Sequence, residues 1–535
     1  MRIFYFSFLF LVSFLSATAQ QHQERLATLD VQHYAFHLSL FDDTDRIEGE
    51  AHLYFQLKKP VSSIHLDLVA ERPDGKGMKV HSASLGDVSL DFRQKEDELA
   101  IDFPVELTLG ESYELRIRYA GIPIDGLVIG QNKFGDRTFF GDNWPNRARH
   151  WLPTIDHPSD KATVEFIVET EERFQVVGTG EKQEETNLPN GRRRTHWGTE
   201  VPLPTKVMVI GAAEFAVTLA GEVRGIPVTS WVFPENREAG FTDYAQAVPV
   251  LDWFQQHVAP YPYEKLANVQ SKTRYGGMEN ASNIFYFENS VTGNKEREAL
   301  IAHEIAHQWF GNSASEADWH HVWLSEGFAT YFTHLYFEHT QGYDVFIDRL
   351  QTDRTNIIRY AQQNPDQPIV DTRITDYTQV LSTNTYQKAS WVLHMLRQKV
   401  GTDTFWEGIR RYYRQYQLGN AYTEDFKNVM ELVSGQELDD FFRQWFFEPG
   451  VPELNVEWKQ TGNLLALSIS QSPSTRHELE LLVEAADSNG RTVGQTRVQL
   501  KAGRTQTTFR VDGKAHHLQL DPKTQLLFKA NLKQQ

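Results

Sequence analysis

Two histidines and two glutamates near the middle of the chain have the types and the spacing of a catalytic zinc site. His303 and His307 are four residues apart, so on a helix both imidazoles face the same point. Glu326 follows His307 by nineteen positions and offers a third ligand; catalytic zinc uses three protein ligands and a water molecule. Glu304 lies beside the first histidine, where a carboxylate can take a proton from that water. The pattern predicts one Zn²⁺ per chain, held by His303, His307 and Glu326, with Glu304 as the base.

The residues around this motif argue against a merely solvated helix surface. A His-x-x-x-His pair on an amphipathic helix is often no more than polar surface. Here the apolar residues 299–301 precede the motif, and Trp309 and Phe310 follow it, so the helix is expected to be buried. Buried polar groups need partners, and a metal ion supplies one. His320 and His321 have no ligand spacing and are expected to be solvated or structural residues of the loop between two helices.

A second motif lies upstream, in residues 275–280, whose sequence is Tyr-Gly-Gly-Met-Glu-Asn. The two glycines before Met278 indicate backbone in an extended or unusual geometry that another group approaches closely. Taken alone, the segment also suits a hairpin turn with a surface glutamate. The interval from Glu279 to His303 leaves room for an edge strand, a loop and the start of the metal helix.

With both motifs the chain resembles the aminopeptidase N family of zinc exopeptidases, which includes the leukotriene hydrolases. The joint signature is Gly-Gly-Met-Glu-Asn at 276–280, His-Glu-x-x-His at 303–307 and the glutamate nineteen positions further on. The resemblance extends roughly from Asp30 to Trp458, and further family-like segments lie at residues 153–163, 261–266, 307–312, 323–329, 386–396 and 445–452.

The resemblance implies an aminopeptidase and assigns further residues. Glu279 is expected to bind the free α-ammonium of a peptide by a charge-assisted hydrogen bond, with Gly276, Gly277 and Met278 beside it. A peptide without that ammonium would leave Glu279 unpaired and desolvated, which is the physical basis of selectivity for a free N-terminus. Tyr386 takes the place of the family's catalytic tyrosine and would donate to the oxyanion. On the residues alone, a packed aromatic side chain at a helix start is the simpler interpretation of Tyr386.

Three positions depart from the family pattern. Relatives commonly have a Glu or Gln in the N-terminal domain that helps to bind the amine, and this chain has Trp144 there, so Asp142, Asn143 or the face of Trp144 could substitute. Thr333 replaces a carboxylate often found seven residues after the third ligand, so the surroundings of the zinc are expected to differ. Ala389 replaces the glycine usual after the lysine of the tyrosine segment, and we interpret this change as neutral.

Three classes of function follow from these residues. The first is a zinc aminopeptidase acting on peptides with a free N-terminus. The second is a zinc endopeptidase or an epoxide hydrolase on the same catalytic fold, and the third is an inactive binding module. Residues 276–280 argue against the endopeptidase. Larger family members carry a long helical C-terminal domain, for which this chain has no room, and that argues against a closed, lipid-shaped cavity. The complete set of catalytic residues argues against an inactive module.

Composition limits the partners of the chain. It has 53 basic and 71 acidic residues and a formal charge of −18, which argues against nucleic acid or an anionic membrane as a general partner. There is no cysteine, so zinc must be bound by histidine and carboxylate. The sequence indicates no oligomeric state.

The first nineteen residues have the pattern of a signal peptide. Arg2 precedes an apolar run over residues 3–15, and Ala17-Thr18-Ala19 is a cleavage site that predicts Gln20 as the new terminus. The run is short for a membrane span, so no transmembrane anchor is expected after processing, with an uncleaved anchor as the alternative. Export without disulfides fits a bacterial periplasm or an extracellular location.

Hydrophobic periodicity divides the remaining chain into three predicted domains. Residues 20–222 alternate in short runs between turns, which indicates an all-β domain. Residues 223–450 have the period of helices, which predicts a mostly helical catalytic domain, thermolysin-like by the resemblance. Residues 451–535 alternate again and suit a small β-sandwich. The prediction is a multidomain α+β protein whose helices cover residues 243–257, 295–311, 323–339, 343–361, 386–400, 403–416, 423–433 and 438–447, with stops at Gly342, Gly401, Gly419 and Gly435.

Overall fold

The computed structural model describes residues 25–471, 477–501 and 503–535, so the expected signal peptide lies outside the described residues. The chain packs into two compact units. The first runs to Trp319 and includes Tyr413–Ala421; the second consists of His320–Tyr412 and Tyr422–Gln535. The predicted domain boundaries after residues 222 and 450 lie inside these units and stay predictions.

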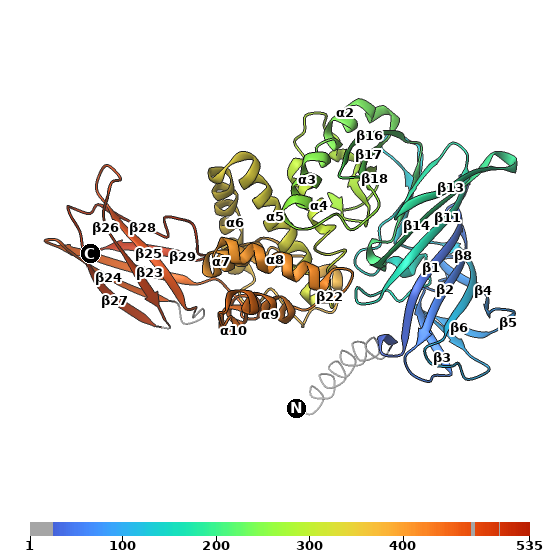
Figure 1. The fold of residues 1–535 in the computed structure, drawn as a ribbon, viewed down its shortest axis with the longest axis horizontal. Helices are drawn as coiled ribbons and strands as arrows, with labels where there is room; N and C mark the ends of the chain where they lie inside the picture. Colours follow the sequence, from blue (N-terminus) through green and yellow to red (C-terminus); the bar gives the residue numbers. More distant parts are fainter. Residues whose placement is uncertain (1–24, 472–476, 502) are drawn as a thin grey trace. The chain divides into compact units, whose positions relative to one another are not determined.

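The first unit begins with a large twisted sheet, drawn in blue to teal in Figure 1. Its strands alternate between buried apolar and more exposed polar residues, as in β1, where Tyr34, Phe36 and Leu38 are buried. This confirms the predicted all-β character of the N-terminal part. The sheet order is β13 (Glu181–Leu188), β14 (Arg192–Pro204), β11 (Lys161–Glu171), β1 (Leu29–Ser39), β2 (Ile47–Leu57), β8 (Ser112–Ile122), β4 (Gly77–Leu85) and β5 (Val88–Ser89).

Two smaller sheets complete this β-rich part. Strand β10 ends at Gly141, so residues 142–147 follow the end of a mostly buried strand. One sheet has the order β3 (Ser63–Asp67), β7 (Glu98–Asp102), β6 (Asp91–Lys95), and the other has the order β12 (Gln175–Gly178), β15 (Ile210–Ala213), β10 (Arg137–Gly141), β9 (Leu127–Gln131).

A mixed five-stranded sheet positions the second motif. Strand β19 (Gly277–Met278) lies at its edge and pairs antiparallel with β20 (Asn283–Phe287). The strand predicted between Glu279 and His303 is β20, but it lies between β19 and β18, so its predicted edge position is wrong. The remaining strands follow in the order β18 (Leu266–Ser271), β17 (Ile226–Val232), β16 (Ala216–Val223). Helices α2 (Arg237–Tyr244), α3 (Ala247–His257) and α4 (Glu298–His307) lie beside this sheet (Figure 1). Helix α4 contacts both α3 and β19.

Two helices of this unit differ from the predicted ranges. The helix expected over 243–257 is divided, because Asp243 closes α2 and its carboxylate accepts hydrogen bonds from the backbone N–H groups of Thr292, Gly293 and Lys295. Helix α4 is shorter than the predicted 295–311. The chain leaves the helix after His307 in a tight turn, in which Gly311 has a φ of 123°.

The second unit is helical up to about residue 447. Helix α5 packs against α6 and α7, and Gly342, Gly401 and Gly435 follow helix ends with φ of 96°, 89° and 64°, which confirms three predicted stops. Gly419 lies in a turn after α8. The helices are α5 (Trp323–Gln341), α6 (Tyr343–Gln363), α7 (Ala389–Val400), α8 (Thr402–Tyr416, which ends in the first unit), α9 (Thr423–Ser434) and α10 (Asp439–Phe442), with π-helical turns at Asn384–Lys388 and Arg443–Phe447.

The C-terminal part consists of two antiparallel-rich sheets, which confirms the predicted β-sandwich. Leu465, Leu467 and Ile469 are buried on one face of β24, as their alternation predicts. Across the described residues, no helix has the length and apolar character needed to cross a bilayer. The sheet orders are β27 (Arg504–Arg510), β24 (Leu464–Gln471), β23 (Glu453–Thr461), β29 (Lys529–Gln534), and β26 (Thr492–Leu500), β25 (Leu479–Ala486), β28 (His517–Leu520).

Candidate active site

Helix α4 brings the two predicted histidine ligands together. Nε2 of His303 and Nε2 of His307 lie 3.1 Å apart. Two nitrogens at about 2.0–2.1 Å from one tetrahedral zinc ion would be separated by about 3.3 Å, so this pair fits the metal. Nδ1 of His307 lies 3.1 Å from the carbonyl oxygen of Phe310. A proton on Nδ1 is held by that carbonyl, which leaves Nε2 as the metal-binding nitrogen.

Glu304 points from α4 toward β19. Its side chain is buried, with 4% exposed. A carboxylate oxygen of Glu304, one of Glu279 and a ring nitrogen of His307 lie within 4.8 Å of one another. The helix and the edge strand therefore bring together the predicted base, the predicted amine-binding carboxylate and one predicted metal ligand.

The glycines at 276 and 277 have different surroundings. A β-carbon on Gly277 would lie 2.2 Å from Oε1 of Glu304, so the Glu304 side chain would have to move. A β-carbon on Gly276 would meet only Cδ1 of Leu300, at 3.9 Å. The close approach expected at these glycines is therefore made at Gly277, by the Glu304 side chain.

The two residues that follow β19 carry buried polar atoms that have no hydrogen-bond partner among the described residues. Oε1 of Glu279 is buried and has no hydrogen-bond partner among the described residues, and the same holds for both amide atoms of Asn280. Leaving such a group unsatisfied costs about 1–3 kcal/mol, and more for a charged group. An anion in this state is suited to a cation that arrives with a ligand. Met278, in contrast, is buried and pairs with Phe285 in the sheet.

The backbone of Glu279 is held by the segment that directly follows His307. Nε2 of Gln308 donates to the Glu279 carbonyl oxygen at 2.9 Å, and Nδ2 of Asn312 donates to the same oxygen at 2.6 Å. Oε1 of Gln308 also accepts from the backbone N–H of Ser282 at 3.0 Å. We assigned no role to these amides from the sequence. Two amide side chains beside Trp309 and Phe310, in a segment expected to be buried, nevertheless indicate that each amide needs a polar partner.

The remaining predicted site residues belong to the second unit. Glu326 lies in the first turn of α5 with 4% of its surface exposed. Tyr386 is half-buried in the π-helical turn that precedes α7. Thr333 donates from Oγ1 to the Ala329 carbonyl oxygen of its own helix at 2.8 Å, so its hydroxyl is bound locally. The assembly of Glu326 and Tyr386 with the α4 residues stays a prediction.

Three histidines without ligand spacing have structural partners. Nε2 of His320 lies 2.9 Å from the Ile374 carbonyl oxygen, and Nδ1 of His321 lies 2.8 Å from Oγ1 of Thr423. Nδ1 of His157 lies 2.7 Å from Oγ of Ser159. Burial lowers the pKa of His150 to about 4, which keeps that ring neutral at pH 7.

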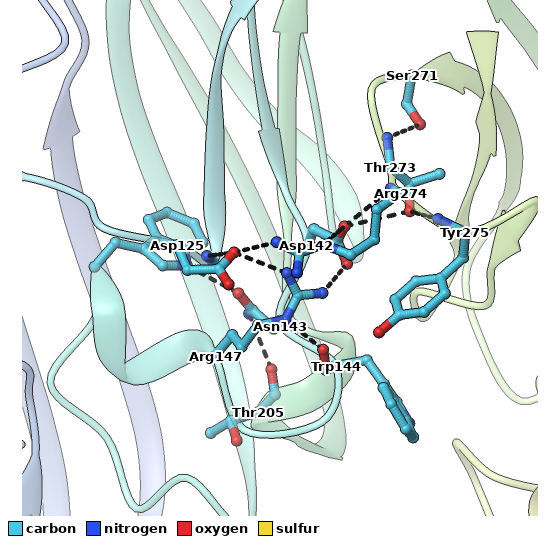
Figure 2. A network of polar contacts seen from close by, with 12 residues as sticks. Asp125, Asp142, Asn143, Trp144, Arg147, Thr205, Ser271, Thr273, Arg274 and Tyr275 are labelled. Carbon is cyan, nitrogen blue, oxygen red and sulfur yellow. Dashed lines mark hydrogen bonds and ion pairs between the residues drawn. The ribbon is translucent and has the colours of Figure 1, made fainter. Parts of the chain in front are cut away.

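The residues proposed to replace the missing Glu or Gln are engaged elsewhere, as Figure 2 shows for Asp142 and Asn143. Asn143 donates to the carbonyl oxygens of Thr205 and Met208 and accepts from Nε1 of Trp151. Trp144 is 2% exposed, and its ring lies edge-to-face on Tyr275 at 5.9 Å and on Trp319 at 5.6 Å. This part of the chain therefore packs against the segment that leads to Glu279.

Comparison with protein families gives two matches. Residues 30–207 match the model of the peptidase M1 N-terminal domain, and residues 243–445 match that of the peptidase family M1 domain. Glutamyl aminopeptidase of Homo sapiens is 26% identical over 460 residues, which is 79% of this chain and 47% of that protein. Aminopeptidase A of Gloydius brevicauda is 29% identical over 391 residues, 69% of this chain and 40% of that protein. The chain thus spans less than half the length of these relatives.

A solved structure matches as well. The M1 zinc metallopeptidase from Deinococcus radiodurans superposes with a TM-score of 0.67 at 25% identity, covering 78% of this chain and 94% of that chain.

Proposed function

This chain belongs to peptidase family M1, and from that membership and the geometry of α4 and β19 we propose that it is a zinc-dependent aminopeptidase. It would hydrolyse the first peptide bond of peptides that have a free N-terminus. One Zn²⁺ per chain would be held by His303 and His307 together with Glu326.

One observation carries the proposal. The carboxylates of Glu279 and Glu304 lie close together beside His307, yet Oε1 of Glu279 is buried without a partner among the described residues. An endopeptidase would have to place an internal stretch of peptide, which carries no ammonium, against that carboxylate. A substrate α-ammonium satisfies it with a charge-assisted hydrogen bond.

Each of these groups would have a separate role in the reaction. Zinc held by His303, His307 and Glu326 would supply Lewis-acid chemistry to the attacking water and the scissile carbonyl. Glu304 accepts a proton from the attacking water and passes it to the nitrogen of the leaving amine. Tyr386 donates a hydrogen bond to the oxygen that becomes negative in the transition state. Glu279 holds the ammonium, so the bond that reaches Glu304 is the first one of the peptide.

Aminoacyl-amide reporters test this function. The protein should cleave reporters with a free α-amine and lose nearly all of that activity when the amine is acetylated. A strong chelator should abolish cleavage, and added zinc should restore it. Equal cleavage of the free and acetylated reporters would favour an endopeptidase instead.

We also propose that the protein is exported to a periplasm or to the outside of the cell. The support is the leader pattern of residues 1–19. Mass spectrometry of the exported protein should find Gln20 as the first residue, and an intact Met1 would contradict the proposal.

A further inference from the structure

The carboxylate of Asp142 joins two segments that are far apart in the sequence (Figure 2). One oxygen accepts from Nη2 of Arg147 at 2.6 Å. The other accepts from the backbone N–H of Arg274 at 3.3 Å and from Oγ1 of Thr273 at 3.4 Å. Asp142 is completely buried, so its charge depends on these partners and cannot be solvated in their place.

The partner of Asp142 is itself fixed. Nε of Arg147 donates to the Trp144 carbonyl oxygen, and Nη1 donates to Asp125 at 2.8 Å. Its guanidinium lies 6.0 Å from the centre of the Tyr275 ring. Three of the donors of Arg147 are thus engaged, and Nη2 binds the Asp142 oxygen that does not contact the turn.

The turn that Asp142 binds leads directly into β19. Oγ of Ser271 accepts from the backbone N–H of Thr273, and Oγ1 of Thr273 accepts from that of Tyr275. The Gly276 carbonyl oxygen then accepts from Phe287 N–H, and β19 begins at the next residue. The segment 273–279 is therefore anchored by Asp142 at its start and by the amides of Gln308 and Asn312 at its end.

We propose that Asp142 is a positioning residue for recognition of the substrate α-amine, because it holds the turn at residues 273–275 and so sets where the Glu279 carboxylate stands. The inference rests on the proposed function of Glu279. This chain has Trp144 at the position where relatives commonly have a Glu or Gln. Its N-terminal part would therefore influence amine binding indirectly, by holding the backbone segment that carries Glu279.

Asp125 provides a matched control. It binds the same two arginines, Arg147 at 2.8 Å and Nη2 of Arg274 at 2.5 Å, and its side chain is 26% exposed. Among the described residues, Asp125 contacts the turn through the Arg274 side chain and forms no hydrogen bond with the turn's backbone. Its replacement therefore perturbs the charges of the network and leaves the anchor of residues 273–275 in place.

The test compares two competitive inhibitors, an amino-acid hydroxamate and the same hydroxamate without its α-amine. Both chelate zinc through the same group, so the ratio of their Ki values measures recognition of the amine alone. In the wild type the amine should tighten binding strongly. A shift of about 1 Å in a positioned group can cost roughly 10²-fold, so Asp142→Asn should reduce this ratio by roughly ten- to a hundredfold with full zinc content. Asp125→Asn should leave the ratio within about twofold of the wild type.

A second variant covers the case in which Asp142→Asn does not fold. Thr273→Val keeps the shape of the side chain and removes one of the two groups through which the turn binds Asp142, so it should reduce the ratio by a smaller factor. A wild-type ratio near one would refute the proposed function. A large wild-type ratio that Asp142→Asn and Thr273→Val leave unchanged, or that Asp125→Asn reduces equally, would overturn the positioning role alone.

Discussion

Gly277 lies against the carboxylate of Glu304 so closely that a β-carbon there would be 2.2 Å from Oε1. Strand β19 and helix α4 thus meet at a position where a β-carbon would displace the Glu304 side chain. This contact, rather than a left-handed backbone, is the reason for the glycine, because Gly277 is not among the residues with positive φ.

Gly277→Ala should displace the Glu304 carboxylate and lower kcat by roughly 10²-fold, because the general base would no longer reach the attacking water. Zinc content should stay at one per chain. Gly276→Ala is the matched variant, since its β-carbon has room, and it should cost much less. Equal losses in both variants would contradict this account of Gly277. Steady-state kinetics with zinc analysis decides between them.

Glu304→Gln should keep the fold and the zinc and lose turnover by roughly 10²-fold or more, the scale of general acid–base catalysis. Glu298→Gln, in the first turn of the same helix, is the control and should stay close to the wild type. Near-normal turnover of Glu304→Gln with a full metal site would remove Glu304 as the base.

His303→Ala and Glu326→Ala should each carry much less than one zinc per chain, because catalytic zinc with only two protein ligands is bound weakly. His320→Ala should retain the metal, since that ring is bound to the Ile374 carbonyl oxygen. Metal analysis after dialysis measures this. Full zinc in both ligand variants would show that the metal is held elsewhere.

Tyr386→Phe should lower kcat by about 10²–10³-fold, the scale of one oxyanion donor. KM should change little, because the negative oxygen exists only in and near the transition state. Tyr377→Phe serves as a control for the loss of a tyrosine hydroxyl. A variant of Tyr386 that loses only substrate affinity would identify the tyrosine as part of the pocket wall.

Glu279→Gln should cost about 2–4 kcal/mol in kcat/KM, the scale of losing one side of a desolvated charge pair. It should also discriminate less between free and acetylated substrates. Trp144→Phe keeps an aromatic ring against Tyr275 and Trp319 and should preserve that discrimination. The opposite pattern, with selectivity lost in Trp144→Phe and kept in Glu279→Gln, would mean that the amine is recognised through the Trp144 indole and not through Glu279.

Features that depend on local spacing were predictable from the sequence. Histidines four residues apart on a helix must share a face, and His303 and His307 do so. Gly342, Gly401 and Gly435 end helices because positive φ favours glycine there. The alternation of β1 and β24 likewise determines which side chains are buried.

Features that depend on distant contacts were not predictable. Asp243 has the sequence context of a helix start, but its carboxylate binds a loop some fifty residues away. Asp142 and Thr273 are separated by 131 positions, and no periodicity connects them. The π-helical turn around Tyr386 has no signal in hydrophobic spacing either, since it differs from an α-helix only in which carbonyl accepts each hydrogen bond.

The two amides that hold the Glu279 carbonyl have a consequence for the products of the proposed aminopeptidase. Gln308 and Asn312 follow His307 by one and five positions, so the backbone of Glu279 is bound to the segment that leaves helix α4. Under the proposed function, a chain end bound by Glu279 would present only its first bond to Glu304. A long peptide would therefore be shortened stepwise, giving a ladder of intermediates that differ by one residue each, and dipeptides would be absent from the early digest.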